Sequence, residues 1–525
     1  VLLCGQSGSG KSACLREAMA NMKSSHHRVV KLAFHEQTQA KDVQDTVDSL
    51  LEKRGRDTFG PPTGSTCVIW VDDLSLPSVA CATARRAGQA SAQPLELIRQ
   101  FCNYGGWYDR AAQSQPFRRT QDCFVVATMS THSAGDRQVS ERLQRHFLLL
   151  GVIPPNNESF VHAFSAILEW KLNLEYFPDE VIARAGTMAA ATMKAVQLVS
   201  EALPQSPSRP QNAVGASDAA RIIEGVLMIH DETKDFQHGL GHIWAHECLR
   251  ALYDRCSSED DRAKALAGIT AAAKSFPYLS QSLAALRNPT LLFTDLFDFE
   301  SDAKVYKEVE DPSEFQRVLQ NIIEQHGASA GQSHELILFP DALDRVARIC
   351  RALRVPTGCA LLIGNPQSGR RSLARLASFL SDMTAIEPHS EQSRHHQPSL
   401  LHWRGKVKDA LKLAGGQSSS AALLFGDADL GDDALCADIY SLLSTGAIPQ
   451  MWASEERATV MEIVQEVERA EAKGKEEELA HGLDSEEEEE EEDGDIAKEE
   501  GHSEWLAAHT KFADRCHHRL HIILC

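Results

Sequence analysis

Gly5-Gln6-Ser7-Gly8-Ser9-Gly10-Lys11-Ser12 follows directly on the apolar run Val1-Leu2-Leu3-Cys4 and precedes a stretch, Ala13–Met22, that we expect to be helical. The octapeptide matches G-x-x-x-x-G-K-[ST] in full, the pattern of a phosphate-binding loop between a strand and a helix. In such a loop the backbone N–H groups turn inward around phosphates, and the helix N-terminus adds a positive dipole. Lys11 is expected to reach the β- and γ-phosphates and Ser12 to offer its hydroxyl to Mg²⁺. The stretch predicts an ATP site; the alternative is a chance glycine-rich turn.

A second part of the site is expected on a neighbouring strand. The run Val68-Ile69-Trp70-Val71-Asp72-Asp73 reads as a buried strand that ends in two acids. Asp72 would hold Mg²⁺ through water, and Asp73 would polarise the attacking water. Most ATPases of the AAA+ class, which this motif set resembles, carry glutamate at that place. Aspartate is one methylene shorter, and a misplacement near 1 Å costs about 100-fold in rate. The alternative is an acidic strand end without catalytic duty.

Two further residues are candidates by their position after the next apolar run, Cys123–Thr128. Thr128 ends that run, where a polar sensor residue would touch the γ-phosphate. Arg142 lies where AAA+ modules carry an arginine finger, which serves the site of the adjoining module. The alternative for Arg142 is an ordinary surface arginine.

A degraded copy of the loop occurs at Gly364-Asn365-Pro366-Gln367-Ser368-Gly369-Arg370-Arg371-Ser372, again after an apolar run and before a helical stretch. Arg370 replaces the lysine and can still pair with phosphate as a planar fork. Arg371 takes the Ser/Thr position and cannot ligate Mg²⁺, and Ser372 comes one place late. Pro366 removes a backbone donor. We expect weak nucleotide binding or none, with Gly364, Ser368 and Gly369 completing the cradle; the alternative is a purely structural relic.

The acidic strand that matches this second loop is Leu423-Leu424-Phe425-Gly426-Asp427. Asp427 is expected to take the metal-holding place, with Ala428 where a catalytic acid would stand. This arrangement predicts poor hydrolysis at the second site.

The α/β rhythm of apolar runs and helical stretches predicts an α/β fold of parallel sheets flanked by helices, with a helical lid. We expect an α/β core over residues 1–155, the lid over 156–310, and a second α/β module over 311–525. Residues 463–502 form a low-complexity acidic stretch, with 18 acids and 4 bases between Glu466 and Glu500. Such a stretch repels itself, so we expect a solvated, disordered insert; the alternative is a partner-binding segment.

Composition excludes some classes of protein. The net charge of the chain is -21, and most of it lies in the acidic stretch. The sequence has no basic patch of the kind that binds nucleic acid. No apolar run is long enough to span a membrane. Thirteen cysteines without a C-x-x-C pair favour reduced thiols over disulfides or a zinc site. Both ends of the sequence read as core strands, so we expect a fragment of a longer chain.

The motifs together resemble the dynein heavy chain, the motor of microtubules. The first module resembles its third AAA+ module through the Walker A loop and the segments Val71–Pro77, Leu95–Gln100, Gly105–Arg110, Arg142–Phe147, Trp244–Arg250 and Tyr253–Arg255. The second resembles the fourth through Phe339–Ala342, Arg348–Arg351, Leu361–Gly364, Ser441–Leu443, Gly446–Pro449 and Leu520–Cys525. The form Asp72-Asp73-Leu74 is more similar to axonemal than to cytoplasmic heavy chains.

This sequence also departs from the family pattern. After the sensor strand the family has a Gly/Pro-rich segment, whereas here the residues are Met129-Ser130-Thr131-His132-Ser133. In the lid, Ser217 stands where the family usually has an arginine before the aspartate that matches Asp218. That departure puts a phosphate-sensing role for this place in doubt.

The resemblance implies a regulatory part of a ring-shaped motor that uses ATP and Mg²⁺ to walk toward microtubule minus ends. It implies partners in the rest of the ring, in microtubules through other segments, and in dynein intermediate and light chains, with no nucleic acid and no membrane. It implies a place in the cytoplasm and cytoskeleton, in the axoneme of cilia or flagella. The alternatives are another AAA+ remodelling ATPase and a nucleotide-binding scaffold without hydrolysis. The sequence ends inside the expected second sensor strand, so the arginine finger for the first site is not in it; we expect ATP to bind and to be hydrolysed slowly.

Overall fold

The structure is a computed structural model of the 525-residue chain. It describes residues 1–6, 8–22, 26–35, 38–77, 93–110, 114–131, 139–174, 177–204, 206, 209–229, 236–279, 283–286, 291–299, 304–326, 338–388, 400–416, 420–449, 451–480 and 500–525.

The chain divides into two compact units. The first comprises Val1–Phe34, Leu51–Pro77 and Leu95–Arg348, and the second His35–Leu50, Ser78–Pro94 and Ile349–Cys525. The first unit therefore contains both the expected α/β core and the expected lid. The boundaries at 155 and 310 stay predictions, since the units divide the chain differently.

The first unit is built on a five-stranded sheet in the order β2-β5-β8-β1-β9, with all neighbouring strands parallel. Its strands are β1 (Leu2–Gly5), β2 (His27–Ala33), β5 (Thr66–Asp72), β8 (Cys123–Ser130) and β9 (Leu149–Gly151). The interior strand β5, second in this order, is buried from Cys67 to Val71, as expected where helices cover both faces of a parallel sheet. The predicted α/β class is confirmed.

A smaller sheet and short helices complete this core. The sheet has the order β3-β4-β7-β6, from β3 (Glu52–Lys53), β4 (Thr58–Gly60), β7 (Phe117–Thr120) and β6 (Gly106–Tyr108). The helices of the core are α1 (Lys11–Ala20), α4 (Gln93–Tyr104) and α5 (Glu141–Gln144). Helix α2 (Ala40–Asp48) belongs to the second unit.

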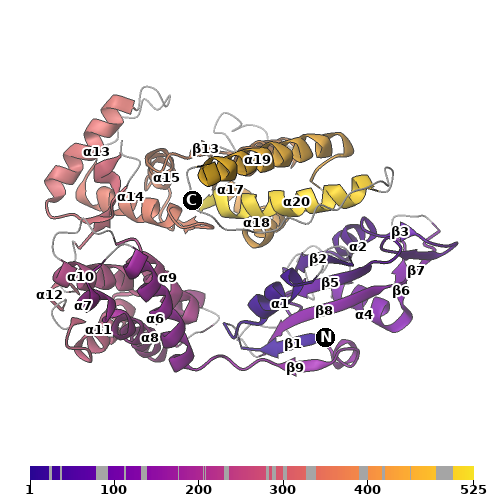
Figure 1. Ribbon diagram of the computed structural model, residues 1–525, viewed down its shortest axis with the longest axis horizontal. Helices are drawn as coiled ribbons and strands as arrows, with labels where there is room; N and C mark the ends of the chain where they lie inside the picture. Colours follow the sequence, from indigo (N-terminus) through magenta and orange to yellow (C-terminus); the bar gives the residue numbers. More distant parts are fainter. Residues whose placement is uncertain are drawn as a thin grey trace. The chain divides into compact units, whose positions relative to one another are not determined.

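The middle of the chain is helical, as predicted for the lid. Its elements are α6 (Asn157–Leu174), α7 (Asp179–Ile182), α8 (Ala185–Ala202), η1 (Pro210–Asn212), α9 (Ala216–Val226), α10 (Phe236–Cys248), the π-helical turn η2 (Leu249–Tyr253), α11 (Glu259–Lys274) and α12 (Leu283–Leu286). Helix α8 is central and packs against α6, α9 and α11 (Figure 1). Its alanine-rich face lets these helices approach closely, and the buried Trp244 donates its indole N–H to Thr192 at 2.9 Å.

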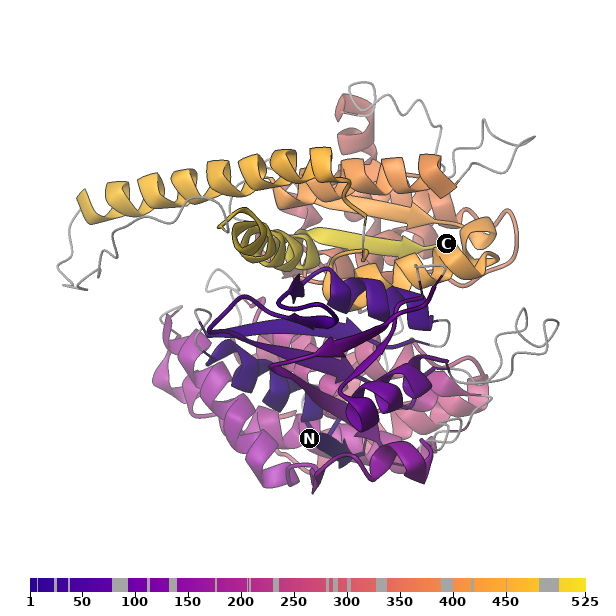
Figure 2. The same ribbon diagram turned by 90° about the vertical axis from the view of Figure 1, so that its right-hand side faces the viewer.

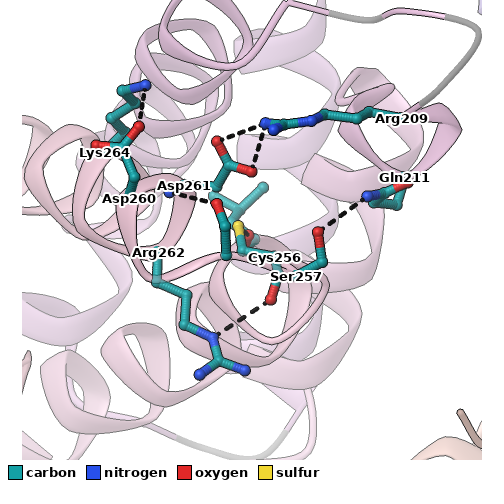
Figure 3. A network of polar contacts seen from close by, with 10 residues as sticks. Arg209, Gln211, Cys256, Ser257, Asp260, Asp261, Arg262 and Lys264 are labelled. Atoms are coloured by element: carbon teal, nitrogen blue, oxygen red, sulfur yellow. Dashed lines mark hydrogen bonds and ion pairs between the residues drawn. The ribbon is translucent and has the colours of Figure 1, made fainter.

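Polar contacts fasten the segment between α8 and α9 to the lid (Figure 3). Arg209 donates to both carboxylate oxygens of Asp261, at 3.1 and 2.8 Å, and the Asp261 side chain is buried. Ser258 caps α11 by accepting from the Asp261 N–H at 3.2 Å. A buried carboxylate is tolerable because it is paired with a cation.

Two strands and two α-helices follow α12 along the chain. Strands β10 (Phe293–Thr294) and β11 (Lys307–Glu308) form an antiparallel pair, with η4 (Leu296–Asp298) between them. Helix α13 (Pro312–His326) precedes α14 (Pro340–Leu353), whose first residues belong to the first unit and whose last belong to the second.

The second unit repeats the strand arrangement of the first. Its sheet has the order β12-β15-β14-β13, all parallel, from β12 (Ala360–Leu361), β13 (Thr384–Ile386), β14 (Ala421–Phe425) and β15 (Leu520–Leu524). Its helices are α15 (Arg370–Leu380), α16 (Leu400–Gly415), α17 (Asp427–Leu430), α18 (Asp433–Thr445), α19 (Ser454–Ala480) and α20 (Glu500–Arg519). β12, β15, β14 and β13 correspond in order to β1, β8, β5 and β2, which confirms two copies of one kind of sheet.

The prediction of a disordered insert over 463–502 is wrong at its start. Helix α19 runs through Ala480 beside α20 (Figure 2). Val460, Val464 and Val467 are buried, at the i, i+4 and i+7 spacing that places them on one helical face. This apolar stripe is hard to recognise in the sequence because acidic residues dominate the composition of the stretch. Residues 481–499, with the run of glutamates, lie outside the described residues.

No helix among the described residues is long and apolar enough to cross a membrane. The described cysteines are all free, and the described residues contain no cluster of metal-binding side chains of the His/Cys/Asp/Glu kind.

Candidate nucleotide-binding sites

The first loop lies between β1 and α1, as predicted. Gly8 and Gly10 have φ of 79° and 85°, a left-handed conformation that glycine adopts without steric cost. A Cβ on Gly5 would lie 2.3 Å from the Val152 carbonyl oxygen, so only glycine fits there. The glycines therefore determine the backbone path of this loop. Ser7 lies outside the described residues.

Lys11 is folded over the loop. Its ammonium group donates to the carbonyl oxygens of Gly5 at 2.9 Å and Gln6 at 2.6 Å, and lies 3.5 Å from Ser9 Oγ. The side chain is only 7% exposed. A charged amine is thus held at the loop, where its predicted role is to contact phosphate oxygens.

Asp72, Ser12 and Thr128 meet at the carboxyl ends of β5 and β8. Ser12 Oγ and Thr128 Oγ1 each donate to the same oxygen, Asp72 Oδ1, at 2.7 Å. The register aligns Val71 with Ala127, so Asp72 and Thr128 are side by side, and Thr128 is fully buried. The structure therefore brings together three residues that the sequence assigned to one site.

These residues suit the Mg²⁺ ion that the motif implies. Mg²⁺ prefers oxygen ligands such as carboxylates and is usually bound together with substrate phosphates. The Ser12 hydroxyl and the Asp72 carboxylate provide such oxygens within hydrogen-bond distance of each other. Ser12 and Asp72 would hold the ion, which would neutralise charge on the phosphates when bound.

Asp73 stands directly after β5 in a left-handed conformation, with φ of 56°. Aspartate is among the few residues that tolerate this region. Its backbone N–H donates to Thr128 Oγ1 at 2.9 Å, so Thr128 ties together both acids of the strand end. The catalytic role of Asp73 and the sensor role of Thr128 stay predictions.

Arg142 lies on the short helix α5 and its side chain is exposed. The described part of the structure records no ion pair for it. An exposed arginine is compatible both with a finger that serves another module and with an ordinary surface residue. The role of Arg142 therefore stays a prediction.

The second loop copies the first in its backbone. Gln367 and Gly369 have φ of 65° and 80°, at the places of Gly8 and Gly10. The Ser368 N–H donates to the Asn365 carbonyl at 3.2 Å, as Ser9 does to Gln6 at 3.3 Å. Helix α15 begins at Arg370 just as α1 begins at Lys11. Arg370 and Arg371 therefore take the places of Lys11 and Ser12.

The register corrects the alignment of the second acidic strand by one residue. Phe425 pairs with Leu524, which pairs with Leu361 three residues before Gly364. In the first unit Val71 pairs with Ala127, which pairs with Leu2 three residues before Gly5. Gly426 therefore takes the place of Asp72, and Asp427 that of Asp73. The prediction that Asp427 has the metal-holding place is wrong, because the strand pairing and not the run of apolar letters sets the register.

Both arginines of the second loop turn toward this strand end. Arg370 Nη2 lies 3.1 Å from Asp427 Oδ2. A Cβ on Gly426 would lie 2.1 Å from Arg371 Nη2, so the guanidinium fills the space beside that glycine. Burial raises the pKa of the neighbouring Cys525 thiol to about 11, and the charges of Arg371 and Arg370 oppose that rise.

The sequence did not identify Asp429, which fixes this strand end. Asp429 is buried, accepts from the Trp403 indole N–H at 3.0 Å and from the Gly426 N–H at 2.8 Å. A signal was available: an acid three residues after a glycine matches the spacing of a capping box.

In the lid, the buried Asp218 accepts from the Gly215 N–H at 3.0 Å and is paired with Arg255. Ser217, at the place where the family carries arginine, precedes it on α9. Asp218 therefore stabilises the lid in this structure.

Residues from three of the family-like segments, together with Asp344, form an ion-pair network that was not predicted from the sequence. Arg250 lies 3.1 Å from Asp254 and 3.4 Å from Asp344, and Arg348 lies 3.3 Å from Asp254 and 2.6 Å from Asp344. These four residues, called the arginine–aspartate quartet below, join the π-helical turn η2 to the start of α14. Asp344 is 94 residues from Arg250, so no local pattern could reveal the contact.

Comparison with known proteins agrees with this geometry. Residues 1–155 match the family described as "P-loop containing dynein motor region", and residues 334–525 match "P-loop containing dynein motor region D4". The chain is 27% identical over 474 residues to mouse "Dynein axonemal heavy chain 2", covering 90% of this chain and 10% of that one. It is 27% identical over 486 residues to human "Dynein axonemal heavy chain 3", covering 90% and 11%.

A third relative, with a flagellar name, matches over a similar share of this chain. The "Dynein-1-beta heavy chain, flagellar inner arm I1 complex" of Chlamydomonas reinhardtii is 27% identical over 488 residues, covering 92% of this chain and 10% of its own length. The chain thus spans about a tenth of the length of these curated relatives. Two P-loop sheets of one topology, both matched by dynein motor families, lead to one conclusion: the chain belongs to the dynein heavy-chain family and represents part of its motor region.

Proposed function

We propose that this part of the motor region is a regulatory ATP-binding segment of a dynein heavy-chain ring. The observation that carries the proposal is the cluster at the first loop, where Ser12 and Thr128 both bond Asp72 while Lys11 is held over the loop. An intact lysine, a metal-binding hydroxyl and an acidic strand end are the parts that bind Mg²⁺-ATP in P-loop proteins.

Slow hydrolysis is the second half of the proposal. Asp73 is shorter than the glutamate of most AAA+ ATPases, and the arginine finger for the first site would come from the adjoining module. Loss of a finger costs about 10³–10⁵-fold in rate. Arg142 would serve the site of the preceding module. The nucleotide state of the first site would then regulate the ring, and the first site would not itself drive the power stroke.

The second loop contributes less in this proposal. Gly364, Ser368, Gly369 and the arginines that follow would bind nucleotide weakly, and the lack of a hydroxyl at Arg371 would prevent ordinary Mg²⁺-assisted hydrolysis.

The remaining proposals concern the whole motor. The relatives carry axonemal and flagellar names, which supports a place in the axoneme of cilia or flagella, within the cytoskeleton. Minus-end-directed movement on microtubules, and assembly with intermediate and light chains, would depend on segments of such motors other than those present here.

The test combines equilibrium binding of Mg²⁺-ATP with single-turnover hydrolysis on the 525-residue chain. The proposal expects binding with turnover far slower than that of an assembled ATPase. Brisk single turnover would overturn it in favour of a free-standing remodelling ATPase, whereas absence of binding would favour a scaffold that does not use nucleotide.

A further inference from the structure

Two residues of the second site differ from their counterparts in the first site, and the two differences are complementary in space. In the first site a small hydroxyl, Ser12, faces a carboxylate, Asp72, at 2.7 Å. At the corresponding places of the second site a long cationic side chain, Arg371, faces a glycine, Gly426. The guanidinium lies where a side chain on Gly426 would begin, 2.1 Å from its Cβ position.

The glycine is held in that position by its own hydrogen bond. Asp429 accepts from the Gly426 N–H at 2.8 Å and is itself bonded to the buried Trp403. Gly426 therefore cannot easily move away from Arg371. A side chain at 426 would therefore require the Arg371 guanidinium to move from its present place.

The exchange removes the Mg²⁺ ligands and leaves a cation in their place. Mg²⁺ needs oxygen ligands, and the hydroxyl and the carboxylate that provide them in the first site are both absent. Arginine stays charged at all physiological pH values and binds phosphate through its planar fork. The first site carries one cation, Lys11, and the carboxylates of Asp72 and Asp73. The second carries two guanidinium groups; Asp427 is paired with Arg370, and Asp429 is bonded to Gly426 and Trp403.

The residues of the second loop therefore do not fit the metal that a P-loop implies. We propose that this loop binds the phosphates of a metal-free nucleoside di- or triphosphate, with the Arg371 guanidinium in the place that Mg²⁺ takes in the first site. This inference rests on the proposed function of the second loop as a nucleotide site. Mg²⁺ adds positive charge beside two guanidinium groups, so it weakens binding here while it strengthens binding at the first loop.

The first experiment isolates the second loop. The full chain carrying Lys11→Ala is titrated with a fluorescent ATP analogue, once with excess Mg²⁺ and once with EDTA. The inference expects binding in EDTA that is as tight as in Mg²⁺ or tighter. Adding Arg371→Ala to this chain removes a charge-assisted contact and should weaken binding in EDTA by about tenfold or more. Binding that requires Mg²⁺ would overturn the inference.

The second experiment rebuilds a metal site. Arg371→Ser together with Gly426→Asp, in the Lys11→Ala background, restores the hydroxyl and carboxylate of the first site. The inference expects this variant to bind the analogue more tightly with Mg²⁺ than with EDTA, by about tenfold, the effect of one restored charge-assisted contact. A thermal melt confirms that the variant folds, and Arg371→Ala, which needs no new side chain, tests the same contact without the double change.

The chain with Lys11 intact separates the possible failures. If it binds in Mg²⁺ but the Lys11→Ala chain binds in neither buffer, the inference is wrong and the proposed ATP site of the first loop stands. If neither chain binds in either buffer, both are wrong. Insensitivity of the Lys11→Ala chain to Arg371→Ala would also overturn the inference.

Discussion

Replacing Arg250 by alanine should destabilise the first unit measurably, because Arg250 pairs with a largely buried acid, Asp254. Arg250 contacts Asp254 at 3.1 Å and Asp344 at 3.4 Å within the arginine–aspartate quartet. The Arg250 and Asp254 side chains are only 13% and 19% exposed. Burial raises the pKa of Asp254, and the charges of Arg250 and Arg348 oppose this rise. The substitution would leave Asp254 with one cation instead of two.

The magnitude follows from this partial burial. Removing one partner of a fully buried ion pair costs about 3–5 kcal/mol. Asp344 and Arg348 are each 35% exposed, so solvent screens their share and Arg348 still serves Asp254. We expect a loss of about 2–3 kcal/mol, which lowers the melting temperature of a unit of this size by roughly 3–5 °C.

Thermal melts of the full chain followed by circular dichroism measure the effect. Lys264→Ala is the matched control, since the Lys264–Asp260 pair at 2.6 Å is exposed on the surface of the same lid. That change should leave the melting temperature nearly unchanged, because solvent screens an exposed pair. If the Arg250→Ala chain melted together with the control, the quartet would not stabilise the junction between η2 and α14.

Two further predictions concern the second unit. Burial lowers the pKa of His521, which is 3% exposed, below its usual value near 6.5, so the folded chain favours the neutral ring; stability should be full above about pH 6.5 and fall as the pH drops toward the lower folded pKa. The loss in urea midpoint between pH 7.5 and 5.5 should be smaller in His521→Gln, and an equal loss would contradict this reading. Val464→Ala should cost about 2 kcal/mol because it opens a cavity between α19 and its neighbours, whereas deletion of 481–499 should leave the melting temperature nearly unchanged. The reverse outcome in the melts would mean that the acidic run, and not the start of α19, supports the fold.

Local features of the fold were predictable because local patterns determine them. The apolar runs gave β1, β5, β8 and β14 with ends within about two residues. The P-loop was recognisable because glycines at fixed places encode its left-handed turns. Such signals lie within a dozen residues of sequence.

Features set by contacts between distant segments were not predictable. Gly426, and not Asp427, occupies the metal-holding place of the second site. The reason is that β14 pairs with β15 in a register that the apolar residues of β14 do not specify. Residues 463–480 of α19 were predicted to be disordered because their acidic residues far outnumber the buried valines Val464 and Val467. The quartet depends on Asp344, whose partners lie about ninety residues away.

The central claim is that Lys11 holds ATP at the first loop, and one titration tests it most directly. The unaltered chain, Lys11→Ala and the control Lys53→Ala, an exposed lysine on β3, are titrated with a fluorescent ATP analogue in excess Mg²⁺, where the second loop contributes least. A charge-assisted contact contributes about 1.5–3 kcal/mol, so Lys11→Ala should weaken binding by about 10–100-fold while Lys53→Ala leaves it unchanged. Equal affinity in all three chains would contradict the account.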